Sequence, residues 1–155
     1  MMLKPTIKVN EPNALPRFAY LNAQWIKELH FMEESDKHMV AHPEIYTQNG
    51  SYVFTAHIDD QVAGACALKY HEDGQYELTK MAVDESYRGR GIGQDLMSFI
   101  HDYAKAEIGV SKLFLLSNTK NAAALRLYTR NGWTVNHRGP HPVYARANIG
   151  MEKIL

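Results

Sequence analysis

The sequence predicts an α+β domain, of the α/β type, in which helices flank a mixed and mostly antiparallel central sheet. Two observations carry this prediction. Short β-prone segments joined by tight turns form a meander in the first half of the chain, and helices alternate with strands in the second half. Because 155 residues suffice for one sizeable core, we expect a single domain over residues 1–155.

The first half is predicted to hold a strand, two helices and an antiparallel meander. Apolar residues recur at helical spacing after the turn at 10–13, and Pro43 ends the second helical stretch, which Ser35 or Asp36 can cap. Asn49-Gly50 and Asp59-Asp60 are turn-forming pairs between β-prone runs. The expected elements are a strand over 6–9, helices over 14–31 and 35–41, and strands over 51–58, 61–70 and 75–83.

The second half alternates helices with strands. The continuous apolar run 113–116 is typical of a strand covered on both faces. Gly109 and the pair Asn131-Gly132 are typical of the left-handed residues that follow helix ends. The expected elements are a helix over 92–104, a strand over 113–116, a helix over 121–130, and strands over 133–136 and 144–154 separated by a loop over 137–142.

Composition and charge argue against several classes of protein. Seventeen Lys and Arg residues balance seventeen Asp and Glu residues, so we expect neither a nucleic-acid partner nor a membrane surface. The single cysteine, Cys66, cannot form an internal disulfide, and its small apolar neighbours indicate a buried core thiol. No apolar run approaches the roughly 20 residues that span a bilayer, and the N-terminus has no signal pattern. We therefore expect a cytoplasmic protein.

The segment Arg88-Gly89-Arg90-Gly91-Ile92-Gly93 indicates a site for a phosphate-bearing ligand. It follows a strand and opens a helix, whose free N–H groups and positive dipole end suit an anion. It is not a Walker A loop, because no Gly-Lys-Ser/Thr follows, and it does not open a first βαβ unit as a dinucleotide fold requires. The alternative is a glycine-rich turn with two solvated arginines.

Two stretches resemble motifs of the GCN5-related N-acetyltransferase (GNAT) family. The first, Glu77-Leu78-Thr79-Lys80-Met81-Ala82-Val83 with Arg88-x-x-Gly91-x-Gly93, is similar to the acyl-CoA-binding motif of that family. The second is similar to the motif that follows it in the family and comprises Leu115-Leu116-Ser117-Asn118, Asn121, Ala124-Leu125-Arg126-Leu127-Tyr128 and Asn131-Gly132-Trp133. The order of strands and helices is also similar from Thr6 to Leu155.

This resemblance implies the acyl-CoA N-acyltransferase fold, with acetyl-CoA as co-substrate. The expected reaction transfers an acetyl group to a primary amine of a small molecule, such as an amino acid, a peptide or an amine-bearing toxin. Two alternatives stay open: a non-catalytic acyl-CoA-binding module, and an N-acetyltransferase that modifies a protein. Exposed sheet edges would also allow a homodimer.

The resemblance also assigns residues to the acyl-CoA. It implies that the pantetheine arm pairs with the backbone of Met81, Ala82 and Val83, and that Asn121 bonds the same arm unless it serves only as a helix N-cap. It implies that the pyrophosphate lies on the amides from Arg88 to Gln94. The full set of expected cofactor-binding residues is Met81, Ala82, Val83, Arg88, Gly89, Arg90, Gly91, Ile92, Gly93, Gln94, Asn118, Asn121 and Tyr128.

Three residues are candidates for the chemistry. The resemblance implies that Tyr128 protonates the departing thiolate, and that the Met81 N–H donates to the thioester oxygen. Strand alternation is expected to put Glu77, Thr79 and Met81 on one face, where the Glu77 carboxylate could take the amine proton directly or through water. Tyr128 could instead be a core aromatic residue. Glu77 could instead form a surface ion pair with Lys69 or Lys80.

The resemblance implies an acceptor groove between the first two helices and the last strands. The acidic residues near the second helix could attract a cationic amine or could merely be a solvated helix end, and Arg146 could bind a carboxylate. The expected acceptor-binding residues are Trp25, Phe31, Glu34, Glu77, Tyr144 and Arg146.

We expect no metal site. His38 and His42 have the i, i+4 spacing of two ligands on one helical face, but the sequence provides no evident third ligand. His137 and His141 share that spacing across Gly139 and Pro140, which exclude a helix between them.

Overall fold

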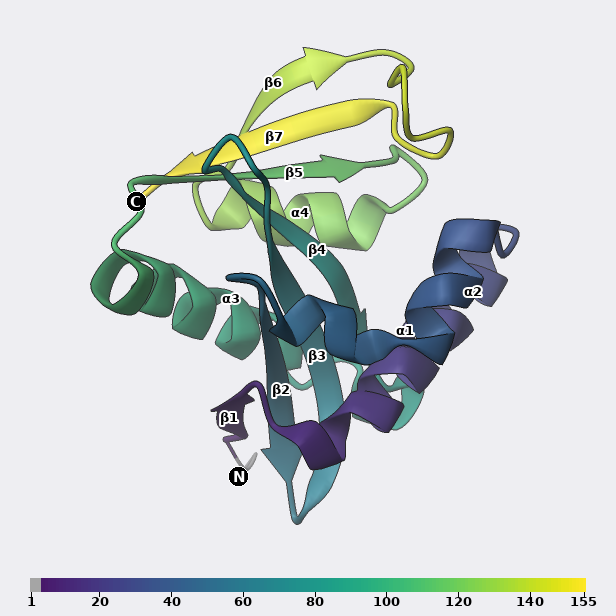
Figure 1. Ribbon diagram of the computed structural model, residues 1–155, viewed down its shortest axis with the longest axis vertical. Coiled ribbons are helices and arrows are strands. Elements are labelled where there is room, and N and C mark those ends of the chain that lie inside the picture. The colour runs from purple at the N-terminus through teal and green to yellow at the C-terminus, as the bar shows by residue number, and fades with distance from the viewer. Residues whose placement is uncertain (1–3) are drawn as a thin grey trace.

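A seven-stranded mixed sheet, flanked by helices, forms the centre of the molecule and confirms the predicted fold class. The computed structural model describes residues 4–155 (Figure 1). The strand order is β1-β2-β3-β4-β5-β7-β6. The strands are β1 Thr6–Val9, β2 Tyr52–Ile58, β3 Gln61–Tyr70, β4 Tyr76–Val83, β5 Lys112–Ser117, β6 Thr134–Arg138 and β7 Ile149–Ile154.

Four α-helices cover the two faces of the sheet. They are α1 Leu15–Leu29, α2 Glu34–Ala41, α3 Ile92–Tyr103 and α4 Ala122–Arg130, with a π-helical turn at Ala104–Ile108 and 3₁₀ turns at Pro12–Ala14, Pro43–Thr47 and Glu85–Tyr87. Helix α1 packs on β3 and β4, whereas α3 packs on β2, β3 and β4 from the opposite face. Helix α4 lies beside α3, where Leu127 approaches Gly93 closely enough that a Cβ there would be 3.2 Å away.

Two apolar clusters separate these helices from the sheet. The larger lies under α3 and α4 and includes Phe54, Leu68 and Leu96 at 0% exposure. The smaller lies under α1 and α2 and includes Phe18 and Met39. Each fully buried side chain of this size contributes about 1.5–3 kcal/mol to stability. These clusters fix the helices on the two faces of the sheet.

Cys66 belongs to the larger cluster, as expected for a core thiol. Its side chain is 0% exposed. Burial raises the pKa of the thiol, so it stays protonated.

The last two strands differ from the prediction in their bounds. His137 and Arg138 pair with β7 instead of forming a loop, and β7 begins at Ile149, not at Tyr144. The residues from Tyr144 to Asn148 form a turn, in which the N–H of Ala147 donates to the Tyr144 carbonyl at 3.1 Å. That stretch contains no β-branched residue to favour an extended strand.

The pairing of β4 with β5 is what creates room for a site. All the other strand pairs are antiparallel, but β4 and β5 run parallel and are in register at Glu77 and Phe114. Beyond that point the two strands separate, and their ribbons diverge in Figure 1. None of the helices described in residues 4–155 is both long and apolar enough to cross a membrane.

His101 of α3 should make stability fall in mild acid. Trp133 Nε1 donates to His101 Nε2 at 3.1 Å, which requires that this nitrogen be unprotonated. Burial, with a smaller effect of Lys153, lowers the pKa of His101 from 6.5 to about 4. The unfolded chain therefore takes up this proton at a higher pH than the folded chain does, and the free energy of unfolding should decrease from pH 6.5 toward pH 4.

Urea unfolding at pH 7.5, 6.0 and 5.0 measures this effect against His101→Gln, whose amide oxygen can still accept from Trp133. The variant should lose less stability on acidification than the original chain. Equal losses in both proteins would contradict the assignment.

Candidate active site

A β-bulge at Lys80 and Met81 interrupts β4 at the point where the strands separate. Ala65 of β3 pairs with Ala82, and Ala67 pairs with Thr79, so two residues of β4 lie opposite the single residue Cys66. Lys80 has a φ of +60°, in the left-handed region that residues other than glycine rarely adopt. Such a bulge bends the strand and redirects its side chains.

Asn22 of α1 holds the bulge in place. Its side chain is buried, with 1% exposure, and its Nδ2 donates to the carbonyl of Lys80 at 3.2 Å and to that of Phe18 at 3.1 Å. A buried carbonyl without a partner would cost about 1–3 kcal/mol. The amide of Asn22 thus stabilises a backbone conformation that the strand alone would disfavour.

The bulge corrects the expectation that Glu77, Thr79 and Met81 share one face of β4. Thr79 pairs with Ala67, which lies in the cluster under α1 and α2. Met81 packs instead against the cluster under α3 and α4. The extra residue shifts the alternation by one position, so the Met81 side chain changes face.

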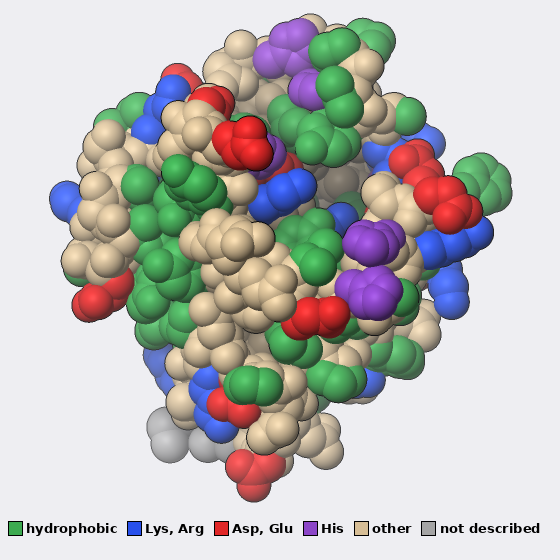
Figure 2. All heavy atoms as spheres, viewed as in Figure 1, with side chains coloured by type: hydrophobic (Ala, Val, Ile, Leu, Met, Phe, Trp, Pro, Cys, Tyr) green, Lys and Arg blue, Asp and Glu red, His purple; other side chains and the backbone are tan. Residues whose placement is uncertain are grey.

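A cavity of about 200 Å³ opens between the separating strands. Figure 2 shows the hollow on this face of the molecule, with Lys and Arg side chains at its edge. Its walls come from α1, residues 77–81 of β4, the end of β5, α4 and the segment before β7. The lining residues used below are Trp25, His30, Tyr46, Lys69, Glu77, Lys80, Met81, Asn118, Asn121, Tyr128, Tyr144 and Arg146.

Most of the predicted catalytic and acceptor residues meet in this cavity, but two do not. Phe31 is 91% exposed, and Glu34 is exposed and pairs with Lys37 at 3.3 Å, so neither lines it. Phe31 follows the end of α1, and Glu34 is the first residue of α2. The predicted residues that do line the cavity are Trp25, Glu77, Met81, Asn118, Asn121, Tyr128, Tyr144 and Arg146.

Tyr128 comes from α4 and is nearly buried, at 8% exposure. Burial, and secondarily the neighbouring Cys66, raise the pKa of its phenol, so the hydroxyl carries its proton at neutral pH. No hydrogen bond of this hydroxyl is found within residues 4–155. Its donor is thus available to a ligand in the cavity.

Asn121 presents a buried oxygen that no other group in residues 4–155 satisfies. Its Oδ1 lacks a hydrogen-bond partner, while its Nδ2 lies 3.4 Å from Ser117 Oγ. The side chain does not cap α4, so the N-cap alternative loses its support. The His30 ring also lines the cavity, and burial, followed by the charge of Arg146, lowers its pKa. An N–H donor on a ligand, such as a pantetheine amide, would satisfy Oδ1.

Glu77 is buried beside a histidine. Its exposure is 7%, and its Oε1 lies 2.9 Å from His71 Nε2. The imidazole, rather than Lys69 or Lys80, is therefore its bonded partner. Burial and then the Glu77 charge raise the pKa of Tyr46 to about 12, and the same two causes raise the pKa of Tyr144.

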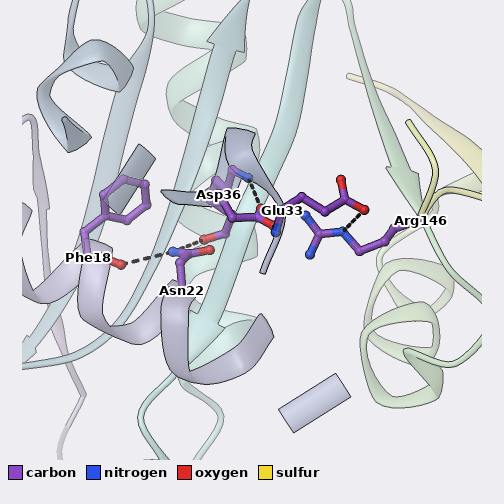
Figure 3. A network of polar contacts seen from close by, with 6 residues as sticks. Phe18, Asn22, Glu33, Asp36 and Arg146 are labelled. Carbon is purple, nitrogen blue, oxygen red and sulfur yellow. Dashed lines mark hydrogen bonds and ion pairs between the residues drawn. The ribbon is translucent and has the colours of Figure 1, made fainter. Parts of the chain in front are cut away.

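A network of charged groups joins α2 to the cavity wall (Figure 3). Asp36 is fully buried, and its Oδ1 lies 2.5 Å from Arg146 Nη2 and 4.0 Å from Lys80 Nζ. Its Oδ2 accepts from the N–H of Glu33 at 2.8 Å, so Asp36 caps α2 from the third position of that helix and not from its start. Glu33 also lies 3.9 Å from Arg146 Nε.

The glycine loop lies at the start of α3, close to one end of the bulged strand. Gly89 and Gly91 have φ values of +78° and +79°, and a Cβ at either position would meet nothing within 4 Å. Backbone conformation, not crowding, thus requires glycine there. The first N–H groups of α3 have no acceptor within the helix and can bind an anion.

The two arginines of the loop already make contacts at the surface. Arg88 pairs with Glu28 of α1 at 3.2 Å, and Arg90 lies over the Tyr87 ring at 5.2 Å. Gln94 exchanges hydrogen bonds of 2.8 Å with Asn131 of α4. These contacts fix the loop against both α1 and α4.

Sequence reasoning missed several residues of the cavity. Asn22 is a polar residue on the apolar stripe of α1, and that signal could have been noticed. The sequence indicated Lys80 only as a possible ion-pair partner of Glu77. Tyr46 lies in a 3₁₀ turn, and no sequence pattern indicates that it lines a cavity. His38 and His42 lie side by side at 5.0 Å, but residues 4–155 contain no cluster of three His, Cys, Asp or Glu side chains that could hold a metal ion.

Comparison with solved structures shows the same fold in known acetyltransferases. A GNAT-family acetyltransferase from Staphylococcus aureus has a TM-score of 0.81 and 21% identity, covering 97% of this chain and 99% of that one. The protein yncA from Salmonella typhimurium, solved with its cofactor acetyl-CoA, has a TM-score of 0.77 and 19% identity, covering 99% and 95% of the two chains.

Comparison with curated proteins gives relatives at higher identity over shorter stretches. Human N-acetylaspartate synthetase is 31% identical over 113 residues, which cover 68% of this chain and 35% of the synthetase. The N-alpha-acetyltransferase RimI of Mycobacterium tuberculosis is 37% identical over 71 residues, which cover 46% of this chain and 42% of RimI. The match thus spans less than half the length of each of these two relatives.

The family itself follows from a match to most of the chain. The family model for the acetyltransferase (GNAT) family matches residues 20–133 of the 155. That range includes the bulged strand, the glycine loop and Tyr128. The chain belongs to the GNAT family of acetyltransferases.

Proposed function

We propose that this chain transfers an acetyl group from acetyl-CoA to a primary amine of a small molecule. One observation carries the proposal: a single cavity has the bulged strand on one side, charged acceptor-side residues on the other, and a protonated tyrosine in its wall. The acetyl-CoA in the yncA structure supports the choice of co-substrate. The cavity volume of about 200 Å³ suits a small acceptor.

The CoA side of the proposal uses mainly backbone groups at the start of α3 and on the β5 side of β4. The N–H groups from Arg88 to Gln94 would hold the pyrophosphate at the positive end of α3. The backbone of Met81, Ala82 and Val83 would pair with the pantetheine arm, and Asn121 Oδ1 would accept one of its amide protons. Asn118 has a smaller part than expected, because its side chain already bonds the Arg146 carbonyl at 2.6 Å and the Lys120 N–H at 2.9 Å.

The chemistry requires a neutral amine, an oxyanion donor and a proton for the thiolate. Glu77, paired with His71, would take the amine proton directly or through water. As the new C–N bond forms and the C–S bond breaks, the Met81 N–H would stabilise the negative oxygen. Tyr128 would then give its proton to the departing sulfur and regain, through water, the second proton that the nitrogen loses as it becomes an amide. Glu77 would release the first proton to solvent, so each ammonium that is acetylated yields one CoA thiol and one free proton.

Released CoA thiol tests this function directly. Acetyl-CoA should give free thiol in the presence of a suitable amine from a panel of amino acids, peptides, polyamines and amine drugs. The names of two relatives, N-acetylaspartate synthetase and spermidine N-acetyltransferase, justify including both acids and polyamines. Tight CoA binding without release for any amine would instead indicate a binding module.

Gly91→Glu should abolish CoA binding. The new side chain would put negative charge at the start of α3, where the pyrophosphate is proposed to lie. Gly109→Glu is the matched control, because Gly109 has a φ of +80° against +79° for Gly91 and is equally uncrowded, but follows the other end of the same helix. Calorimetric titration with CoA should show a loss of at least about 100-fold for Gly91→Glu alone, close to 3 kcal/mol. Equal losses in both variants would contradict the loop assignment.

Tyr128→Phe should lower kcat by about 100-fold or more while leaving CoA affinity nearly unchanged, since a positioned acid typically contributes 10²–10⁴-fold. The change removes only a hydroxyl that has no protein partner in the described chain, so the stability of the fold should be preserved. Steady-state kinetics and CoA titration on the same preparation separate the two effects. An unchanged kcat would assign the proton to another group or to water.

A further inference from the structure

The acceptor side of the cavity carries more positive than negative groups. Lys69, Lys80 and Arg146 line it, whereas Glu77 is the carboxylate among its lining residues. Lys69 lies directly opposite Glu77 in the register of β3 and β4, so these two charges face the same side and offset each other. The other two cations that line the cavity, Lys80 and Arg146, have no carboxylate opposite them among its lining residues.

Asp36 holds both of these cations in place from behind. It is fully buried, whereas the Lys80 and Arg146 side chains keep 20% and 26% of their surface exposed. Its Oδ1 faces the two cations and its Oδ2 is taken by the N–H of Glu33. A guanidinium has five N–H donors and an ammonium has three, so both cations keep donors that Asp36 does not use.

The two carboxylates of this network differ in burial. Asp36 is fully buried and faces both cations. Glu33 is 44% exposed and lies 3.9 Å from Arg146 Nε, so solvent screens its attraction for the guanidinium. Burial is the main cause that lowers the pKa of Lys80; the charge of Asp36 opposes this effect, and the charge of Arg146 adds to it. An anion bound at this point would stabilise both cations.

We propose that Lys80 and Arg146 bind a carboxylate of the acceptor, which makes the acceptor an amino acid and not a simple amine or a polyamine. This inference rests on the proposed function and names the substrate class of the same cavity. The planar guanidinium of Arg146 suits a two-pronged contact with a carboxylate. The amine end would lie toward Glu77 and His71, so that one small molecule spans the two charged parts of the wall.

Matched acceptors test the proposal. L-alanine, L-aspartate and L-phenylalanine are each compared with the corresponding α-carboxamide and decarboxylated amine, and CoA thiol release gives kcat/KM. A hydrogen bond to a charged group contributes about 1.5–3 kcal/mol, so at least one amino acid should exceed its two analogues by about 10- to 100-fold. Equal or faster reaction of the carboxamides or amines would overturn the proposal and leave the acetyltransferase function intact.

Arg146→Gln and Lys80→Gln should remove this preference. The KM for the best amino acid should rise by about 10-fold or more, while the KM for its carboxamide stays within about twofold. A purely structural role would change both values alike. Arg130→Gln, on the exposed last turn of α4, is the matched control and should keep the preference. The double variant Asp36→Asn, Arg146→Gln removes the buried charge together with its partner, so the test still holds if Arg146→Gln does not fold.

A binding measurement decides the matter if no amine releases CoA, which would refute the proposed function. Trp25 lines the cavity, so its fluorescence should respond to a bound ligand. N-acetyl-L-alanine is titrated in the presence of CoA and compared with N-acetyl-L-alaninamide. Saturable binding of the acid that is at least about 10-fold tighter than that of the amide supports the carboxylate site. Equal binding, or none, overturns it.

Discussion

The hydrogen bond from Asn22 to the Lys80 carbonyl is the interaction on which the rest of the site depends. It stabilises a bulge that places Lys80 at a positive φ and turns the following backbone away from regular pairing. Without that bulge, β4 could continue alongside β5, and the cavity between them would be filled by ladder hydrogen bonds. A single buried amide on α1 therefore links the first helix to the opening at the centre of the sheet.

The two ends of the cavity are built on different principles. The end that we propose for CoA consists of backbone groups: a helix start, two left-handed glycines and a strand that, in residues 4–155, pairs with β5 only at Glu77. The acceptor end uses side chains, and these come from segments far apart in the sequence, as the pairing of Asp36 with Arg146 shows. Backbone donors suit a ligand common to many enzymes, whereas side chains can vary and so set the acceptor.

Local patterns were sufficient to predict the elements but not the contacts between them. The turn sequences on either side of β3 correctly predicted its bounds at 61–70, and the glycine loop correctly predicted that α3 begins at Ile92. The bulge escaped prediction because Lys80, unlike glycine, gives no sign of a left-handed backbone. Phe31 and Glu34 were misplaced because helical spacing does not tell where the chain turns outward, and the Asp36–Arg146 pair is separated by 110 residues.

Amide chemical shifts during a titration with CoA test the central claim most directly, since they report on each backbone N–H separately. The largest changes should fall on Met81 to Val83, beside the gap between β4 and β5, and on Arg88 to Gln94, at the start of α3. The amides of β1 and β6, at the two edges of the sheet, should change little. Saturable binding of CoA with its largest shifts at those edges, or outside both segments, would contradict the account.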